Sequence, residues 1–221
     1  MLNSLFLTSR DMGMTDATLF YVHDPMCSWC WAYRPALLQI QDALRGKVDI
    51  IDIVGGLAPD TDEPMPQDMQ QTIEGYWRKI AAQLGTEFNY DFWKKNTPRR
   101  ATYPACRAVL AAEKQGGQDT ARAMTLAIQQ AYYLRAMNPS EEDTLLQLAD
   151  EMGLNFDIFM ADLDSDAIQT ELLEAIAFAR SIGGNNFPSW FLKQGDVYTH
   201  IPVDYESAHT TLALISEARQ R

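Results

Sequence analysis

Strand-like patterns lie near the two ends of this chain, and helical patterns fill the long stretch between them. Ala17 to His23 and Val48 to Val54 are short runs rich in β-branched and aromatic residues, separated by a helical pattern from Ser28 to Leu44. Ser189 to Leu192 and Val197 to Ile201 form a second pair of strand candidates around a loop with turn residues. The first pair with its helix is a β-α-β unit, so an α/β protein is expected.

Helix start and stop signals divide the middle of the chain, after a break in composition at Pro59 to Pro66. Thr102 and Pro104 predict the start of a helix that ends at Gly116-Gly117. Ser140 to Asp143 has the spacing of a capping box at the start of another helix. Two more helices are expected, from about Asp166 to Ile182 and from Asp204 to Arg219.

Composition excludes several classes of protein. Hydrophobic residues make up 47% of the 221 and charged residues 22%, which argues against disorder. The net charge of −12 disfavours nucleic acid or an anionic membrane as a partner. Residues 141–174 hold eleven acids and no Lys or Arg, which leaves −1 for the rest of the chain. The acidity is therefore local, and it does not exclude an anionic ligand elsewhere.

The sequence also suggests where the protein works. No apolar run approaches the roughly 18 residues of a transmembrane helix. Three cysteines make a poor disulfide framework, because one would be left over. We therefore expect a soluble, cytoplasmic protein. Residues 1–14 are expected to be a disordered leader, since their apolar stretch is too short for a signal peptide.

Cys27-Ser28-Trp29-Cys30 is a C-x-x-C motif at the point where a predicted strand gives way to a helix. A thiol at a helix N-terminus meets unpaired N–H groups and the positive end of the helix dipole, which favour the thiolate. Cys27 is therefore the candidate nucleophile. Cys30 is expected to be buried and to resolve a mixed disulfide.

Two other roles fit the same cysteines. A zinc site would need two further ligands, and Cys106 and His23 are the only sensible candidates, since there is no second C-x-x-C. Free cysteines are also often inert residues of a core. The placement of the motif favours a redox dithiol without a metal.

A proline far along the chain supports the redox interpretation. Phe187-Pro188 follows a Gly- and Asn-rich loop and precedes a strand candidate, a position where a cis peptide bond is plausible. The alternative is an ordinary trans proline that opens an edge strand. The presence of the dithiol favours the first interpretation.

The chain contains, in this order, a strand, the sequence D-P-M-C-S-W-C-W at a helix start, a helical stretch, a G-G-N-N-F-P loop, a hairpin and a final helix. This order resembles the DsbA-like branch of the thioredoxin superfamily, and most closely the FrnE-like oxidoreductases. The resemblance runs from Ala17 onward. It implies a thioredoxin fold, a central mixed sheet flanked by helices, with an inserted all-helical subdomain. Residues 15–64 and 183–221 would form the discontinuous thioredoxin-like domain, and residues 65–182 the insertion.

The resemblance also implies roles for individual residues. Cys27 would be the nucleophile, Cys30 the resolving cysteine and Pro188 a cis-proline that faces the dithiol, while Phe187 would give backbone contacts to an extended substrate. Many relatives carry Pro where this chain has Ser28, and Phe187 is bulky. Because the dipeptide helps to set the redox potential, the physiological direction of the reaction stays open.

Further candidates surround the motif. Ser28 and Trp29 are expected to contact the substrate, Trp29 as a partly exposed apolar platform. Asp24 and His23 are candidates for a proton relay, with a turn or capping role and a packed, neutral histidine as the alternatives. Cys106 is expected to be a core cysteine.

A basic cluster provides a second candidate surface, formed by Lys94, Lys95, Arg99, Arg100 and Arg107. It predicts binding of an anionic substrate or of glutathione near the dithiol, with Arg99 and Arg100 as the binding residues.

The leading prediction is thus a thiol–disulfide oxidoreductase that acts on protein or small-molecule thiols and disulfides. It needs no metal or nucleotide, and glutathione is a candidate co-substrate. Kappa-class glutathione transferases and 2-hydroxychromene-2-carboxylate isomerases are a rival class by resemblance, but they typically carry Ser where this chain has Cys27. A non-catalytic binding module that uses the basic cluster is the third interpretation.

Overall fold

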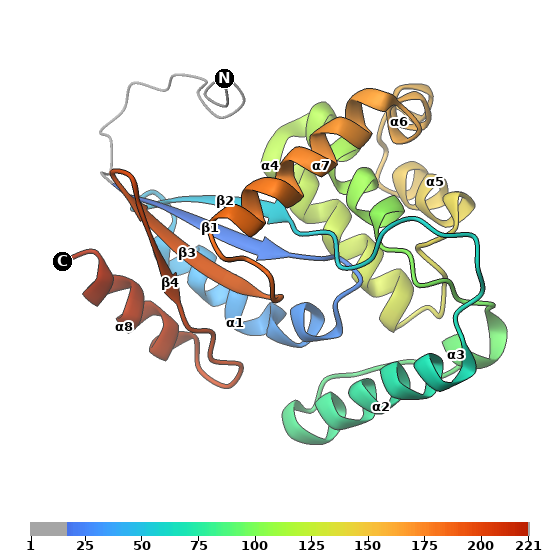
Figure 1. Cartoon of the computed structure of the whole chain (residues 1–221), viewed down its shortest axis with the longest axis horizontal. Helices are drawn as coiled ribbons and strands as arrows, with labels where there is room; N and C mark the ends of the chain where they lie inside the picture. Colours follow the sequence, from blue (N-terminus) through green and yellow to red (C-terminus); the bar gives the residue numbers. More distant parts are fainter. Residues whose placement is uncertain (1–16, 221) are drawn as a thin grey trace.

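The computed structural model describes residues 17–220 (Figure 1), so the predicted leader at residues 1–14 lies outside it. The strands are β1 (Ala17–His23), β2 (Asp49–Val54), β3 (Ser189–Gln194) and β4 (Val197–Ile201). The helices are α1 (Ser28–Leu44), α2 (Gln67–Leu84), α3 (Phe92–Lys95), α4 (Tyr103–Tyr133), α5 (Glu142–Glu151), α6 (Phe156–Leu163), α7 (Asp166–Ser181) and α8 (Ala208–Ala218).

The four strands form one mixed sheet in the order β2-β1-β3-β4. β1 runs parallel to β2, as a β-α-β unit requires, and antiparallel to β3, with Phe20 opposite Phe191. β3 and β4 pair as a hairpin. Strands from the two ends of the chain therefore meet at the centre of the sheet, and the predicted fold class is confirmed.

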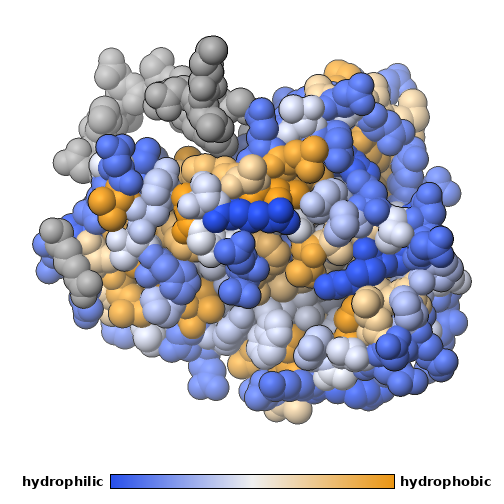
Figure 2. Space-filling model, in the orientation of Figure 1, coloured by the Kyte–Doolittle hydropathy of each residue, from blue (hydrophilic) through white to orange (hydrophobic). Residues whose placement is uncertain are grey.

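Helices cover both faces of the sheet (Figure 1). Alternate residues of each strand point to opposite faces. Leu19, Tyr21 and Trp190 are buried with residues of α1 and α8, whereas Phe20 and Phe191 are buried on the other face with residues of α7. On the side of the molecule shown in Figure 2, polar side chains predominate and apolar patches lie between them.

The helices between β2 and β3 have a hydrophobic core of their own. α4 is central, because it contacts α5, α6, α7 and β2. Its residues Met124 and Ile128 are buried with residues of α5 to α7, and Met26 and Val54 belong to the same cluster. This core therefore reaches the end of the sheet where β1 and β2 finish, while α7 also covers one face of the sheet. The division into two domains stays a prediction.

The predicted helix stop at Gly116-Gly117 is confirmed as a break within α4: both glycines leave the helical conformation, Gly117 with φ of 71°, and a second helical segment continues from the bend to Tyr133. Two other helix predictions were wrong in detail. Ser140 does not cap α5, whose N-cap is Glu141, because the Ser140 hydroxyl donates to the Ala101 carbonyl oxygen at 2.7 Å. α8 begins only at Ala208, because the Asp204 carboxylate accepts hydrogen bonds from the backbone of a turn at residues 204–207.

Within residues 17–220, no helix combines the length and the apolarity that crossing a bilayer needs.

Candidate active site at the start of α1

The dithiol lies at the N-terminus of α1, in the loop that follows β1. Cys27 is the N-cap residue and Cys30 lies in the first turn. The Trp31 amide donates to the Cys27 carbonyl oxygen at 3.1 Å, and the amides before it have no partner within the helix. Cys27 is therefore beside the positive end of the helix dipole, where the sequence placed it.

The two cysteines differ in depth. Cys27 has an exposed fraction of 7% and Cys30 of 1%, and both thiols are free. Burial raises the pKa of the Cys30 thiol well above its ordinary value, and a hydrogen bond with Cys27 raises it further. Cys30 therefore keeps its proton at neutral pH, which suits a thiol that acts second.

The Phe187–Pro188 segment lies against Cys27 from the far end of the chain. The peptide bond between these two residues is cis. The Cys27 thiol contacts the Phe187 carbonyl oxygen, with 3.6 Å between Sγ and O. The Phe187 ring lies directly over Gly55, where an added Cβ atom would be 2.0 Å from Cε1. A side chain at residue 55 would therefore displace the ring that adjoins this contact.

Asp24 anchors the loop between β1 and α1. Its side chain is completely buried, and Oδ1 accepts a hydrogen bond from the Met26 amide at 2.8 Å. Oδ2 accepts from the Leu57 amide at 2.7 Å, from the Thr102 hydroxyl at 2.7 Å and from the Cys106 thiol at 3.5 Å. These contacts correspond to the turn role that the sequence left open, and they join the loop to α4.

Tyr133, at the C-terminal end of α4, holds the same loop at its other end. Its buried hydroxyl donates to the Met26 carbonyl oxygen at 2.7 Å. Trp31 stacks on the Tyr133 ring, with 5.7 Å between the ring centroids. Asp24, Thr102, Cys106 and Tyr133 are called the closed side of the dithiol below.

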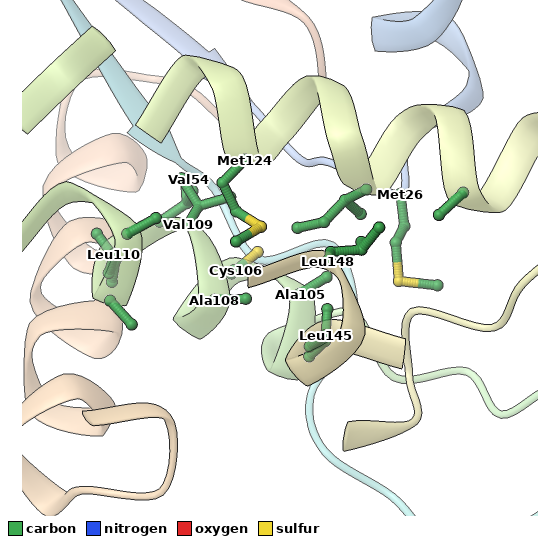
Figure 3. Close-up of a cluster of buried hydrophobic side chains, with 14 of the residues drawn as sticks. Met26, Val54, Ala105, Cys106, Ala108, Val109, Leu110, Met124, Leu145 and Leu148 are labelled. Carbon is green, nitrogen blue, oxygen red and sulfur yellow. The ribbon is translucent and has the colours of Figure 1, made fainter. Parts of the chain in front are cut away.

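Cys106 is a core residue, as predicted. Figure 3 shows it among Met124, Ala105 and Leu148, with Met26 in the same cluster. Burial raises the pKa of its thiol well above the ordinary value, and the nearby Asp24 carboxylate adds to this.

His23 ends β1 and is buried, with its ring stacked on Tyr21 at 5.3 Å between centroids. Its Nδ1 atom has no hydrogen-bond partner. Burial lowers the pKa of the imidazole, so the neutral form predominates at neutral pH. This is the packed, neutral histidine that the sequence left as the alternative to a proton relay.

The other side of the dithiol is open to solvent. Ser28 and Trp29 are both partly exposed. Trp29 packs edge-on against Tyr205, with 5.0 Å between the ring centroids. These two aromatic residues line a groove of about 600 Å³ together with Leu84, Val203, Asp204 and Glu206. Trp29, Asp204, Tyr205 and Glu206 are called the open side below.

Four of the five residues of the basic cluster pair with acids, most of which are distant in the sequence. Arg99 pairs with Asp62 at 3.0 Å and with Glu141 at 3.3 Å, and Arg107 pairs with Asp60 at 2.8 Å. Lys94 and Lys95 both pair with Asp91. Arg100 is partly buried and lies near enough to Tyr132 to act on its pKa. Carboxylates that lie nearby in the folded structure therefore offset most of the positive charge of this cluster.

Among residues 17–220, the structure contains no group of three or more His, Cys, Asp and Glu side chains that could hold a metal ion.

Sequence reasoning missed three residues near the dithiol. Thr102 was predicted only as the N-cap of α4, and it occupies that position, but its hydroxyl donates to Asp24 instead of capping the helix. Tyr133 and Tyr205 carried no local signal, because each contacts the site through packing between distant segments.

A thioredoxin family model matches residues 20–199. The chain therefore belongs to the thioredoxin family. Its fold is DsbA-like, as the sequence resemblance implied.

Curated relatives of this thioredoxin-family chain include the ClpXP adapter protein SpxH of Halalkalibacterium halodurans, which is 29% identical over 152 residues. The match covers 64% of the present chain and 47% of the relative, so the chain spans about half the length of the curated relatives it matches.

Solved structures give wider coverage. A proposed protein disulfide isomerase from Nitrosomonas europaea superposes with a TM-score of 0.81 at 23% identity, over 92% of this chain and 98% of that one. The cytosolic disulfide reductase DsbM from Pseudomonas aeruginosa gives a TM-score of 0.73 at 24% identity, over 92% and 100%. DsbM has also been solved with GSH. At these identities the likeness establishes the fold.

Proposed function

We propose that this protein is a thiol–disulfide oxidoreductase in which Cys27 attacks and Cys30 resolves. The observation that carries the proposal is the difference in depth between the two thiols at a helix N-terminus. Cys27 lies beside unpaired amides and next to the Phe187 carbonyl, while Cys30 is almost completely buried. A cysteine at position 27 also favours redox chemistry over the isomerase class, in which a serine is expected there.

The proposed reaction has two exchange steps. The Cys27 thiolate attacks one sulfur of a substrate disulfide, forms a mixed disulfide and releases the other substrate sulfur as a thiolate. Cys30 then loses its proton and attacks the Cys27 sulfur, which forms the Cys27–Cys30 disulfide and releases the second substrate thiolate. Two electrons pass to the substrate, and two thiolates are released that take up protons. A thiol reductant must return two electrons before the next cycle.

We further propose a cytoplasmic setting with glutathione as that reductant, in an FrnE-like member of the DsbA branch. The likeness to a cytosolic disulfide reductase that has been solved with GSH supports this proposal. The equilibrium of the dithiol with glutathione redox buffers would decide the direction. A potential well below that of the glutathione couple would leave GSH unable to reduce the Cys27–Cys30 disulfide and would overturn the proposed role of glutathione as reductant, whereas a potential well above it would make the protein an oxidant of its substrates.

Trapping tests the proposed roles directly. Cys30→Ser should accumulate a mixed disulfide between Cys27 and a model disulfide such as 2-hydroxyethyl disulfide, detected as a mass adduct that dithiothreitol removes. Cys27→Ser should accumulate none, because the buried Cys30 is protonated and shielded. Equal adduct formation by both variants would contradict the assignment of Cys27 as the attacking and Cys30 as the resolving cysteine.

A second candidate function is that of an adapter, and the match to ClpXP adapter proteins favours it. An adapter binds its partners without exchanging disulfides. The double variant Cys27→Ser/Cys30→Ser distinguishes the two functions. An adapter would retain partner binding in this variant, whereas an oxidoreductase would lose all turnover.

A further inference from the structure

The groove on the open side has the properties of a binding site. Trp29 lies between the two cysteines in the sequence and forms part of the wall. The opposite walls come from the C-terminal turn of α2, with Leu84, and from the connection between β4 and α8, with Val203 and Tyr205. Figure 1 shows this end of α2 opposite the β4–α8 connection. The groove therefore adjoins the dithiol motif through Trp29, although neither cysteine lines it, and its lining is partly apolar and partly acidic.

Negative charge is concentrated at this groove. Asp204 and Glu206 line it, and no Lys, Arg or His is among the lining residues that belong to the described part of the chain. Hydrogen bonds from the Glu206 amide, the Thr210 hydroxyl and the Ser207 amide lower the pKa of Asp204, so its carboxylate is ionised at neutral pH. The last turn of α2 adds the negative end of a helix dipole.

The aromatic lining favours a cation for an independent reason. The faces of tryptophan and tyrosine rings attract guanidinium and ammonium groups. Trp29 and Tyr205 meet edge to face, at an interplanar angle of 60°. The Tyr205 ring also packs edge-on against Tyr33, with 5.6 Å between the ring centroids, so it adjoins the helix that begins at the dithiol.

We propose that this groove binds a segment of a protein substrate that carries an Arg or Lys side chain within a few residues of the reacting cysteine. The inference rests on the proposed function and names its substrate class. The cation would lie between the aromatic rings and the carboxylates of Asp204 and Glu206, while neighbouring apolar atoms contact Leu84 and Val203. Glutathione, with two carboxylates, is not the ligand that this groove selects.

Matched peptides test this selectivity. Peptides of one sequence, with Arg, Gln or Glu two residues after a single cysteine, are prepared as mixed disulfides with thionitrobenzoate, and release of the chromophore by reduced protein is followed. Each rate is divided by the rate with dithiothreitol, which removes differences in intrinsic reactivity. The Arg peptide should exceed the Glu peptide in kcat/KM by roughly tenfold at low ionic strength, and the ratio should fall as salt is added.

Isosteric variants locate the effect. Asp204→Asn and Glu206→Gln keep the shape of each side chain and should each reduce the ratio of kcat/KM for the Arg peptide to that for the Glu peptide. The double variant should bring this ratio close to the value expected without any selection by charge. Glu217→Gln is the matched control, because it changes the net charge by the same amount on an exposed position of α8 outside the groove. It should leave the ratio unchanged.

The outcomes separate this inference from the proposed function. If the wild-type protein reduces 2-hydroxyethyl disulfide but shows no preference among the peptides, the groove does not select cations. An equal effect of Glu217→Gln would assign the preference to the net charge of the molecule and overturn the inference in the same way. If neither the peptides nor 2-hydroxyethyl disulfide react, the proposed function fails, and this inference fails with it.

Discussion

On one side of the dithiol, Asp24, Thr102 and Tyr133 are buried and hydrogen-bonded, whereas on the other side Trp29, Asp204 and Glu206 line a groove that is open to solvent. The closed side comes from the helices between β2 and β3, and it holds the loop at residues 24–27. The open side comes mainly from the connection between β4 and α8, and it leaves room for a ligand. The comparison indicates that the helices between β2 and β3 hold the loop that carries the thiols, and we propose that the segment after β4 selects the substrate.

The largest expected effect on stability comes from replacing an aspartate by alanine on each side of the dithiol and comparing the two costs. Asp24→Ala leaves the Met26 amide, the Leu57 amide and the Thr102 hydroxyl without their acceptor in a buried site, and should lower the free energy of unfolding by about 3 kcal/mol. Asp204→Ala removes two backbone hydrogen bonds from the turn that precedes α8, where water can replace the lost acceptor, and should cost much less than Asp24→Ala. Urea unfolding in excess dithiothreitol measures both values. Equal costs would show that the closed side is not the better anchor.

The outcome of the sequence predictions follows the same division. The dithiol at the start of α1, the β-α-β unit and the C-terminal hairpin were predictable, because each depends on residues that are close together in the sequence. The closed side was not predictable from the sequence, because Thr102 and Tyr133 are 78 and 107 residues from their hydrogen-bond partners in the loop. No local sequence pattern indicates which hydroxyl will donate a hydrogen bond to a buried carboxylate in the folded chain.

Ser140 shows why local signals fail in the same region. Its spacing to Asp143 suits a capping box, but its hydroxyl donates to the carbonyl oxygen of Ala101, 39 residues away in the sequence. The same competition applies to Thr102, which holds the N-cap position while its hydroxyl bonds to Asp24. Tertiary partners outcompete the local cap at both residues.

A second prediction asks whether tight packing continues from the closed side to the Phe187 segment. Gly55→Ala places a methyl group within contact distance of the Phe187 ring, and should destabilise the protein by about 2 kcal/mol through overpacking. Gly75→Ala is the matched control, because nothing lies near that position of α2, and removing a helical glycine should instead stabilise by up to about 1 kcal/mol. Opposite signs in thermal unfolding would support tight packing at Phe187, and similar signs would contradict it.

A third prediction uses pH to test whether the closed side excludes water from the Cys106 thiol. Burial raises the pKa of Cys106 in the folded state, so its contribution to stability is complete below the pKa of an unfolded cysteine and is lost as pH rises above that value towards the folded pKa. Above about pH 9, wild type should therefore lose about 1.4 kcal/mol per pH unit more than Cys106→Ala. Urea midpoints from pH 7 to 10 give the two slopes. Parallel slopes would mean that the Cys106 thiol is hydrated.

The smallest effect compares two tyrosines, one from each side. Tyr133→Phe removes the hydrogen bond to the Met26 carbonyl and leaves a buried acceptor unpaired, so it should cost about 1 kcal/mol. Tyr205→Phe keeps the ring contacts with Trp29 and Tyr33, and its cost should lie within about 0.5 kcal/mol. Unfolding of the two variants in parallel, in excess dithiothreitol, cancels any contribution from the dithiol itself. If Tyr205→Phe costs as much as Tyr133→Phe, the open side supports the fold as the closed side does, and the separation between holding the thiols and selecting the substrate no longer stands.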